Sequence, residues 1–265
     1  MTSVSAPTAS PVNALRLTES EVRFYQDEGY LYLGGLVKAE AVEAVRQEVL
    51  GVIEGHFGIT EDDLRHATSA SDKLRQSNQY LKGSLLEELI SGEPIKTVAS
   101  QIIGGPAHVY LPFTAVKAGG GGGMFHFHQD NNYTNHEPAL GSINIWVALV
   151  DMSPDNGCLQ VVPRSHKDGQ LASHNSDDGD GHQQLEVDPL TCLPVRMRAG
   201  DAVAFTRWTV HGSGPNTTDQ ARVAYALQFH RDDVSWIDKE TNEKKLLLDS
   251  PRFAIGPVDR IERRD

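Results

Sequence analysis

Apolar residues in the N-terminal third of the chain recur mainly at steps of three and four. Between residues 38 and 57, six positions share this spacing: Ala41, Val42, Val45, Val49, Val52 and Ile53. The spacing predicts an amphipathic helix that packs against a sheet. Thr18 and Glu21 have the spacing of a capping box, so we expect a helix that begins there and ends near Gly29. Two shorter helices are predicted over residues 83–91 and 93–103.

After Pro106 the pattern changes to short β-rich runs separated by turn residues. Seven runs have this character: 107–117, 124–130, 142–150, 158–162, 194–198, 202–206 and 222–230. Many short strands after a helical N-terminal third predict a mainly β fold with flanking helices, built as a β-sandwich or barrel. Residues 58–82 and 166–189 lack these patterns. We expect loops there, the first near an entrance and the second on the surface as a candidate lid.

The chain ends and the composition set further limits. Residues 1–17 are predicted to form a disordered tail that lacks the segments of a signal peptide, and residues 18–265 a single domain. Because 36 acidic residues exceed 24 basic ones, for a net charge of −12, nucleic-acid and anionic-membrane partners are disfavoured. Cys158 and Cys192 are too few for a disulfide framework, and no apolar run is long enough to span a membrane. We therefore expect a cytoplasmic monomer or homodimer that acts on a small molecule.

Candidate metal ligands occur in two segments that are distant in sequence. His128 and Asp130 are two positions apart in a predicted strand, so their side chains point the same way, and His211 lies in the second segment. Two imidazoles and one carboxylate on one face of a metal are typical of non-haem Fe(II) oxygenases, because three coordination positions stay open. The same alternation places His126 beside these residues, which is one candidate ligand more than such a site requires.

Other metal sites use similar residues. The HFHQD run at 126–130 begins the signature of metallo-β-lactamase-like zinc hydrolases, but Asn131 stands where that signature has a histidine. A cupin-like pattern starts at Gly120, yet the glutamate of that pattern is missing. The glycine run 119–123 lacks the Gly-Lys-Ser/Thr of a phosphate-binding loop, so it is interpreted as a flexible loop.

Four blocks carry a family resemblance: FHFHQDNNY at 125–133, INIWVALVD at 143–151, NGCLQVVPRSHK at 156–167 and HGSGPNTTDQARVAYALQF at 211–229. In order and spacing they resemble the phytanoyl-CoA dioxygenase family of Fe(II)- and 2-oxoglutarate-dependent oxygenases. The stretch LTESEVRFYQDEGYLYLGGL resembles the opening of that family. The resemblance implies a double-stranded β-helix, the jelly-roll core of cupin-like proteins. It also implies Fe(II) as the metal, with 2-oxoglutarate and O2 as cosubstrates.

Residue roles can be carried over onto the matching positions. The resemblance makes His128, Asp130 and His211 the iron ligands of the catalytic centre. It assigns Arg222 to the distal carboxylate of 2-oxoglutarate, a role that suits a planar guanidinium with a permanent charge. Ser213 matches the hydroxyl group with which the family contacts the same cosubstrate.

Further pocket residues follow from the resemblance and from strand alternation. Trp146 and Phe113 match positions that wall the cosubstrate pocket, although core packing explains them equally well. Asn144 shares a strand face with Trp146, and Gln228 lies on the corresponding face of its own strand. A polar side chain that faces a closed cavity usually has a partner. Asn144, Gln228 and His126 are therefore predicted to contact substrate.

Together these assignments predict an enzyme that oxidises, by default hydroxylates, an unactivated C–H bond of a small molecule, with release of succinate and CO2. A secondary-metabolite intermediate is the expected substrate. Halogenases of this superfamily have a small residue in place of the carboxylate ligand, so Asp130 disfavours halogenation. A zinc-dependent or cupin-like metal hydrolase that ignores 2-oxoglutarate is the alternative, and a catalytically silent binding protein is a third hypothesis. Isolated histidines such as His136 and His182 are interpreted as surface or hydrogen-bonded core residues.

Overall fold

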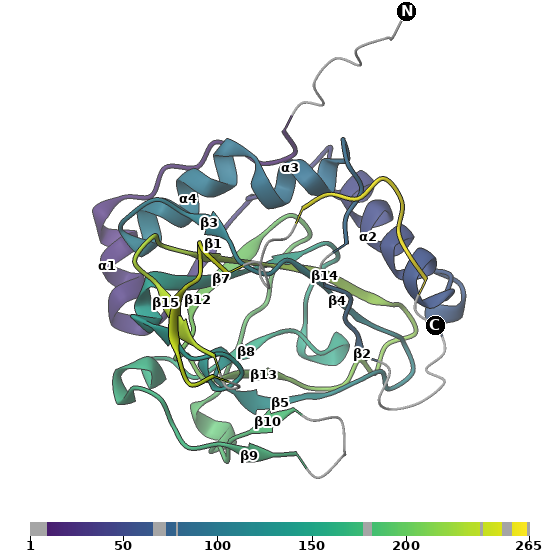
Figure 1. The fold of residues 1–265 in the computed structure, drawn as a ribbon. Helices are drawn as coiled ribbons and strands as arrows, with labels where there is room; N and C mark the ends of the chain where they lie inside the picture. Colours follow the sequence, from purple (N-terminus) through teal and green to yellow (C-terminus); the bar gives the residue numbers. More distant parts are fainter. Residues whose placement is uncertain are drawn as a thin grey trace, which may run out of the picture.

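Two facing antiparallel sheets form the centre of the protein (Figure 1). The computed structural model describes residues 10–65, 73–77, 79–176, 182–238, 241–250 and 256–263. In spatial order the larger sheet contains β1 (Tyr30–Leu33), β12 (Ala202–Thr206), β7 (Ser142–Ala148), β14 (Arg222–His230), β4 (Phe113–Lys117) and β2 (Lys73–Leu74), and β3 (His108–Val109) also pairs with β14. The smaller sheet contains β11 (Leu193–Pro194), β8 (Gln160–Val161), β13 (His211–Ser213) and β5 (Phe125–His128).

In the described ranges, four α-helices flank the larger sheet: α1 (Glu19–Glu28), α2 (Val42–Phe57), α3 (Leu85–Ser91) and α4 (Glu93–Ile103). In Figure 1, α2, α3 and α4 lie over the face of this sheet that is turned away from the smaller sheet, and α1 contacts β1. Val49 of α2 and Ile95 of α4 belong to the same apolar cluster as Ile145 and Tyr225 of the sheet. Burial of this cluster therefore attaches the helices to the sheet.

Two inward-facing residues of β14, Ala224 and Ala226, are small and leave room between the sheets. All nine residues of the strand are buried. Tyr225 and Leu227 pack in the cluster beneath the helices, whereas Ala224 belongs to the cluster between the two sheets. Ala224 is paired in register with Ala115 of β4 and Ala148 of β7. Because a row of alanines fills little volume, the facing side chains can enclose a cavity.

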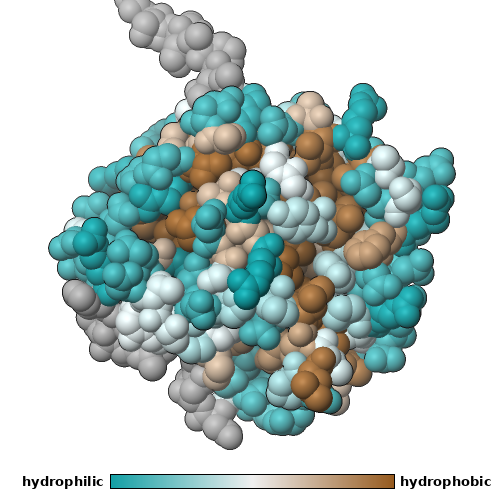
Figure 2. Space-filling model, turned by 180° about the vertical axis from the view of Figure 1, so that it is seen from behind, coloured by the Kyte–Doolittle hydropathy of each residue, from teal (hydrophilic) through white to brown (hydrophobic). Residues whose placement is uncertain are grey.

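The remaining elements are short. A third sheet contains β6 (His136–Glu137), β15 (Ser235–Ile237) and β16 (Lys244–Leu246), and β9 (His174–Asn175) pairs with β10 (Gln183–Gln184). The described residues also form 3-10 helices: η1 (Asp63–Arg65), η2 (Asp130–Asn132), η3 (Ala139–Gly141), η4 (Pro154–Asn156), η5 (Ser165–Asp168) and η6 (Pro189–Thr191). Figure 2 shows a face on which hydrophilic residues predominate, with separate apolar patches between them. No helix in the described ranges is long and apolar enough to cross a membrane.

The predicted mainly β fold with flanking helices and a jelly-roll core is confirmed. All four predicted helices are present. In the predicted capping box, the Thr18 hydroxyl accepts a hydrogen bond from the N–H of Glu21, and helix α1 ends at Gly29 with a φ of 82°. These local signals act over three or four residues, so the sequence alone expresses them completely.

Other expectations need correction. The predicted disordered tail to residue 17 is too long, because Val12 is buried and bridges to Val37, and Leu17 packs on the main apolar cluster. Its first nine residues lie outside the described ranges. The predicted surface loop 166–189 includes the end of η5 and the β9–β10 pair, and residues 58–82 contain η1 and β2. Strands of two residues are held by their tertiary pairing, which leaves little periodic signal in the sequence.

Candidate active site

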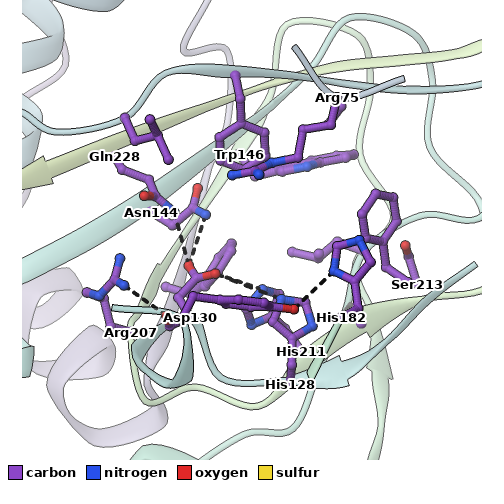
Figure 3. Close-up of a pocket in the computed structure, with 18 of the residues that line it drawn as sticks. Arg75, His128, Asp130, Asn144, Trp146, His182, Arg207, His211, Ser213 and Gln228 are labelled. Carbon is purple, nitrogen blue, oxygen red and sulfur yellow. Dashed lines mark hydrogen bonds and ion pairs between the residues drawn. The ribbon is translucent and has the colours of Figure 1, made fainter. Parts of the chain in front are cut away.

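His128, Asp130 and His211 converge between the two sheets (Figure 3). His128 ends β5 and is paired in register with His211 at the start of β13, while Asp130 begins η2. The Oδ1 atom of Asp130 lies 3.8 Å from Nε2 of each histidine. One possible ligand atom from each residue lies within 4.8 Å of the other two, and the described part of the chain contains no second cluster of this kind. The structure thus brings the predicted ligand set together.

Backbone carbonyls hold both imidazole rings with Nε2 toward Asp130. Nδ1 of His128 lies 2.7 Å from the carbonyl oxygen of His126, and Nδ1 of His211 lies 3.0 Å from that of Thr209. A carbonyl only accepts, so each Nδ1 carries the proton and each Nε2 keeps a lone pair for a metal. Burial, together with the neighbouring His211, lowers the pKa of His128 and favours this neutral form.

The Asp130 carboxylate is held from its other side. Its Oδ2 atom accepts hydrogen bonds from the side-chain amides of Asn144, at 3.2 Å, and Gln228, at 3.3 Å. Burial alone would raise the pKa of Asp130, but His211, Arg207 and neighbouring donors outweigh it and lower that pKa. The carboxylate is therefore ionised, with Oδ1 directed to the two histidines and Oδ2 to the two amides. Asn144 and Gln228, predicted as substrate contacts, thus contact a candidate metal ligand.

His126 is the predicted site residue that the structure moves away from the pocket. It does not line the cavity, whereas Phe125 does. The pairing of β5 with β13 explains this, because His128 is opposite His211 while Phe125 is opposite Ser213. Three steps on one strand match two on the other, so β5 contains an irregularity of the β-bulge type. Strict alternation fails there, and the prediction that His126 faces the metal is wrong.

Arg222 begins β14 and is 2% exposed. Its Nη1 donates to the carbonyl oxygen of Gly157 at 3.0 Å and its Nη2 to that of Ala115 at 3.2 Å. Nε has no partner among the described residues. Burial lowers the pKa of Arg222 to about 9, and no described carboxylate is paired with it. A buried guanidinium with an unused donor and no counter-ion is suited to an anionic ligand.

Lys117 lies beside Arg222, and the sequence analysis does not identify it as a site residue. The two residues are paired in register on β4 and β14, and Lys117 is fully buried. Its Nζ donates to the Oγ of Ser213 at 2.7 Å and to the carbonyl oxygen of Gly214. Ser213, predicted as a cosubstrate contact, therefore lies between a buried lysine and the cavity. Alternation from Phe113 places Lys117 on the inward face of its strand, so the signal for this residue was present.

A cavity of about 300 Å³ connects these groups. Trp146 and Phe113 both line it, as predicted, and the centre of the Arg222 guanidinium lies 5.0 Å from the centroid of the Trp146 ring. Most of the remaining wall is apolar or aromatic, with contributions from these residues: Tyr110, Leu111, Phe125, Tyr133, Leu159 and Phe205. The cavity therefore has the candidate metal ligands on one side and the positively charged Arg222, with Lys117 behind it, at one end. Apolar and aromatic side chains form most of its other walls.

The model of the phytanoyl-CoA dioxygenase (PhyH) family matches residues 25–224. The chain belongs to this family. Phytanoyl-CoA dioxygenase domain-containing protein 1 of Danio rerio is 26% identical over 81% of this chain and 89% of its own length. L-proline trans-4-hydroxylase of Streptomyces griseoviridis is also 26% identical, over 86% and 88%.

A solved structure of EvdO2 from Micromonospora carbonacea var. aurantiaca, complexed with 2-oxoglutarate, has the same fold. It matches with a TM-score of 0.66 at 20% identity, over 91% of this chain and 98% of that one. Family membership makes the protein a non-haem oxygenase that uses Fe(II), 2-oxoglutarate and O2, as predicted.

The cavity of this phytanoyl-CoA dioxygenase family member is also lined by residues with basic side chains that the sequence analysis does not identify. Among the described residues these are Arg75, His182 and Arg207. Arg207 donates to the carbonyl oxygens of Asp130, at 2.8 Å, and Thr134, so it holds the segment that carries the carboxylate. His182 lies 3.1 Å, through Nδ1, from the hydroxyl of Tyr133. The interpretation of isolated histidines is confirmed for His136, whose Nδ1 lies 2.9 Å from the Ser142 hydroxyl. His182 is instead part of the pocket wall.

Proposed function

We propose that this oxygenase hydroxylates an unactivated C–H bond of a small molecule, an intermediate of secondary metabolism, and that His128, Asp130 and His211 hold its Fe(II). The observation that carries the proposal is the occurrence of this buried triad in one cavity with Arg222, a buried cation without a described counter-ion. When bound, the iron, 2-oxoglutarate and O2 supply the oxidant that cleaves the C–H bond, with succinate and CO2 as further products.

The three proposed ligands fit a divalent metal. Two neutral imidazole nitrogens and one ionised carboxylate oxygen are the donor set that binds non-haem iron while leaving one face open. The carbonyls of His126 and Thr209 keep both rings in the required tautomer. The Asn144 and Gln228 amides hold one carboxylate oxygen, so the other is oriented for the metal.

The cationic end of the cavity fits the distal carboxylate of 2-oxoglutarate. Arg222 offers its free Nε–H and a charge that burial makes costly until an anion is bound. The Ser213 hydroxyl accepts a hydrogen bond from Lys117, which leaves its own O–H free to donate to a carboxylate oxygen. We therefore assign Arg222 and Ser213 as direct contacts, and Lys117 as the residue that orients Ser213 and adds positive charge.

The remaining space fits an organic substrate. Trp146 and Phe113 are part of a wall that excludes water and strengthens the electrostatic contacts inside the cavity. The Oδ1 atom of Asn144 is buried and has no hydrogen-bond partner among the described residues. It is the acceptor that the substrate, or a water molecule beside it, would use, which keeps part of the predicted substrate role of Asn144.

The contacts of Asn131 argue against the alternative of a two-metal zinc hydrolase. The Nδ2 of this side chain donates to Gln170, and its Oδ1 accepts from the backbone N–H of His136 and from Nε of Arg207. These contacts fix Asn131 as a buried structural residue at the position where that class of hydrolase places a metal ligand.

Anaerobic titration tests the proposed function directly. Adding 2-oxoglutarate to the Fe(II)-loaded enzyme should produce a visible charge-transfer band, because the cosubstrate binds the metal that the triad holds. Asp130→Ala should remove both the band and the 2-oxoglutarate-dependent formation of succinate. Full succinate formation by this variant would refute the ligand assignment. A screen of succinate release against small metabolites would then identify the substrate.

A further inference from the structure

Arg75 lies in the cavity wall opposite the proposed metal ligands. It follows β2 at the edge of the larger sheet, and its guanidinium carbon is 4.2 Å from the centroid of the Phe113 ring. In Figure 3, Arg75 and Trp146 lie on one side of the cavity and His128, Asp130 and His211 on the other. A ligand between these walls would therefore have the Arg75 charge at one end and the metal site at the other.

The three arginines found among the described lining residues differ in their partners. Arg222 donates to two backbone carbonyls at the proposed cosubstrate end. Arg207 donates to the carbonyls of Asp130 and Thr134 and to the Asn131 side chain. Arg75 makes no hydrogen bond or ion pair with any residue in the described ranges, and stacks on an aromatic ring instead. Its N–H groups are thus available to a ligand.

The exposure and the electrostatic surroundings of Arg75 are consistent with its place in the cavity wall. The residue is exposed, yet burial by the surrounding protein lowers the pKa of its guanidinium, and Asp130, Tyr133 and Tyr110 partly counter that effect. All three of those residues line the same cavity. Both observations fit a side chain whose accessible surface faces a partly enclosed space near the metal ligands.

The charge of the loaded pocket leaves a place for an anion. Asp130 is the only acidic residue among the described residues that line the cavity, against three arginines. The charges of a divalent metal and of the 2-oxoglutarate dianion cancel each other, so the pocket remains positively charged with both bound. An uncompensated positive charge in a partly dry pocket attracts an anionic ligand.

Arg75 and Arg222 differ in what holds their guanidinium groups. The two Nη atoms of Arg222 donate to the carbonyls of Gly157 and Ala115. The Arg75 guanidinium lies against the Phe113 ring and has no hydrogen-bond partner in the described ranges. A cosubstrate anchored at Arg222 therefore leaves Arg75 for a second molecule.

We propose that Arg75 binds a carboxylate of the primary substrate, which is then a small organic acid with an apolar body. This inference rests on the proposed function, because it takes the cosubstrate to occupy Arg222 and the triad. A guanidinium stacked on an aromatic face is held in plane and presents its two-pronged N–H edge to a carboxylate. The aromatic walls contact the apolar body, and the far end of the molecule presents a C–H bond to the metal site.

Binding of simple acids tests this proposal without turnover. The enzyme is loaded anaerobically with Fe(II) and 2-oxoglutarate, then titrated calorimetrically with benzoate and cyclohexanecarboxylate and with their primary amides. The wild type should bind at least one acid about tenfold more tightly than its amide, because charged hydrogen bonds form only with the acid. Arg75→Gln should abolish this preference, and Arg75→Lys should retain part of it.

Two controls separate the possible failures. Arg23→Gln, which removes an exposed arginine of α1, should behave as the wild type. The charge-transfer band should persist in Arg75→Gln and throughout each titration. Equal acid binding by the wild type and Arg75→Gln, or no acid binding to the wild type, would overturn the proposal for Arg75. Loss of the band on adding acid would also overturn it, since the acid would then have displaced 2-oxoglutarate. Absence of the band in the wild type would instead refute the proposed function.

Discussion

Asn144 and Gln228 are paired in register on neighbouring strands, and both donate their side-chain amides to the same oxygen of Asp130. The sheet thus supplies two rigidly spaced donors for one carboxylate oxygen, while the other oxygen points toward the two histidines. A carboxylate that rotated freely would lose entropy on binding a metal. Here the two amides on the sheet already fix the orientation of the Asp130 carboxylate. Hydrogen bonds that orient a metal ligand in this way raise the affinity for the metal.

Replacing Gln228 by methionine should therefore weaken metal binding. Methionine keeps a similar volume but cannot donate to Asp130, so the expected loss in Fe(II) affinity is about tenfold or more. Anaerobic titration with Fe(II) measures this loss. Gln47→Met on α2 is the matched control, because the Gln47 amide donates to Glu43 and Glu61 at the surface; this variant should bind Fe(II) as the wild type does.

The same variant distinguishes two roles for Gln228. If this residue contacts substrate, as the strand pattern predicts, Gln228→Met should raise the KM for the substrate and leave Fe(II) affinity unchanged. If it positions Asp130, metal affinity should fall and added Fe(II) should restore much of the kcat. Unchanged metal affinity would argue against the positioning role.

The parts of this site that the sequence predicts are those encoded locally. His128 and Asp130 lie within one short motif, and alternation correctly turns Asn144 and Gln228 inward. Alternation cannot show that both amides meet Asp130, because that contact depends on how the two sheets face each other. It also fails at His126, where the irregularity in β5 exchanges the inward and outward positions.

Residues outside regular strands could not be found in this way. Arg75 and His182 reach the cavity from segments without a hydrophobic period, so only the tertiary fold places them in the wall. Lys117 is different, since it lies on the same face of β4 as Phe113, four residues along the strand. Burying a lysine costs free energy unless its ammonium group has hydrogen-bond partners. The partners of Lys117, Ser213 and Gly214, are visible only in the folded structure.

Arg222→Lys should weaken 2-oxoglutarate binding by about tenfold or more while leaving Fe(II) binding intact. Lysine keeps the positive charge but loses the planar fork and cannot contact Gly157, Ala115 and a ligand together in the same way. The concentration of 2-oxoglutarate that gives half of the charge-transfer band measures the effect. An unchanged half-saturation concentration would show that Arg222 does not bind the cosubstrate.

Gly157→Ala should both destabilise the fold and lower the affinity for 2-oxoglutarate. A Cβ at Gly157 would lie 2.4 Å from the carbonyl oxygen of Gly214 and 3.1 Å from Nζ of Lys117, at a residue whose φ is +70°. We expect a loss of more than about 2 kcal/mol in the free energy of unfolding, from the strained φ and the backbone clash combined. Urea denaturation measures this loss.

Gly104→Ala is the matched control for Gly157→Ala. Gly104 has a φ of +71° and nothing within 4 Å of the added Cβ, so only the cost of the left-handed backbone remains, about 1 kcal/mol. Its affinity for 2-oxoglutarate should be unchanged. If both variants lost the same stability and kept the same affinity, the close approach at Gly157 would have no part in shaping the site.

Buried histidines should make the metal-free protein less stable as the pH falls from 7.5 to 5.5. Burial lowers the pKa of His136 well below 6.5 and also lowers that of His230. The unfolded chain, whose histidines keep a pKa near 6.5, then binds more protons than the folded chain does. Stability is therefore full above that value and declines below it. For His136, whose folded-state pKa lies well below 6.5, the loss at pH 5.5 is about 1 kcal/mol.

The variant His136→Gln isolates one of these histidines. Glutamine does not titrate and can still contact the Ser142 hydroxyl, so the difference in unfolding free energy between pH 7.5 and 5.5 should shrink by about 1 kcal/mol. The exposed His174 provides the control, His174→Gln, which should leave that difference unchanged. Carboxylates with lowered pKa values, such as Glu43, do not contribute in this range, because their stabilisation is lost only when the pH falls through and below about 4.5. An identical pH dependence in His136→Gln and the wild type would show that His136 is not the source of the acid sensitivity.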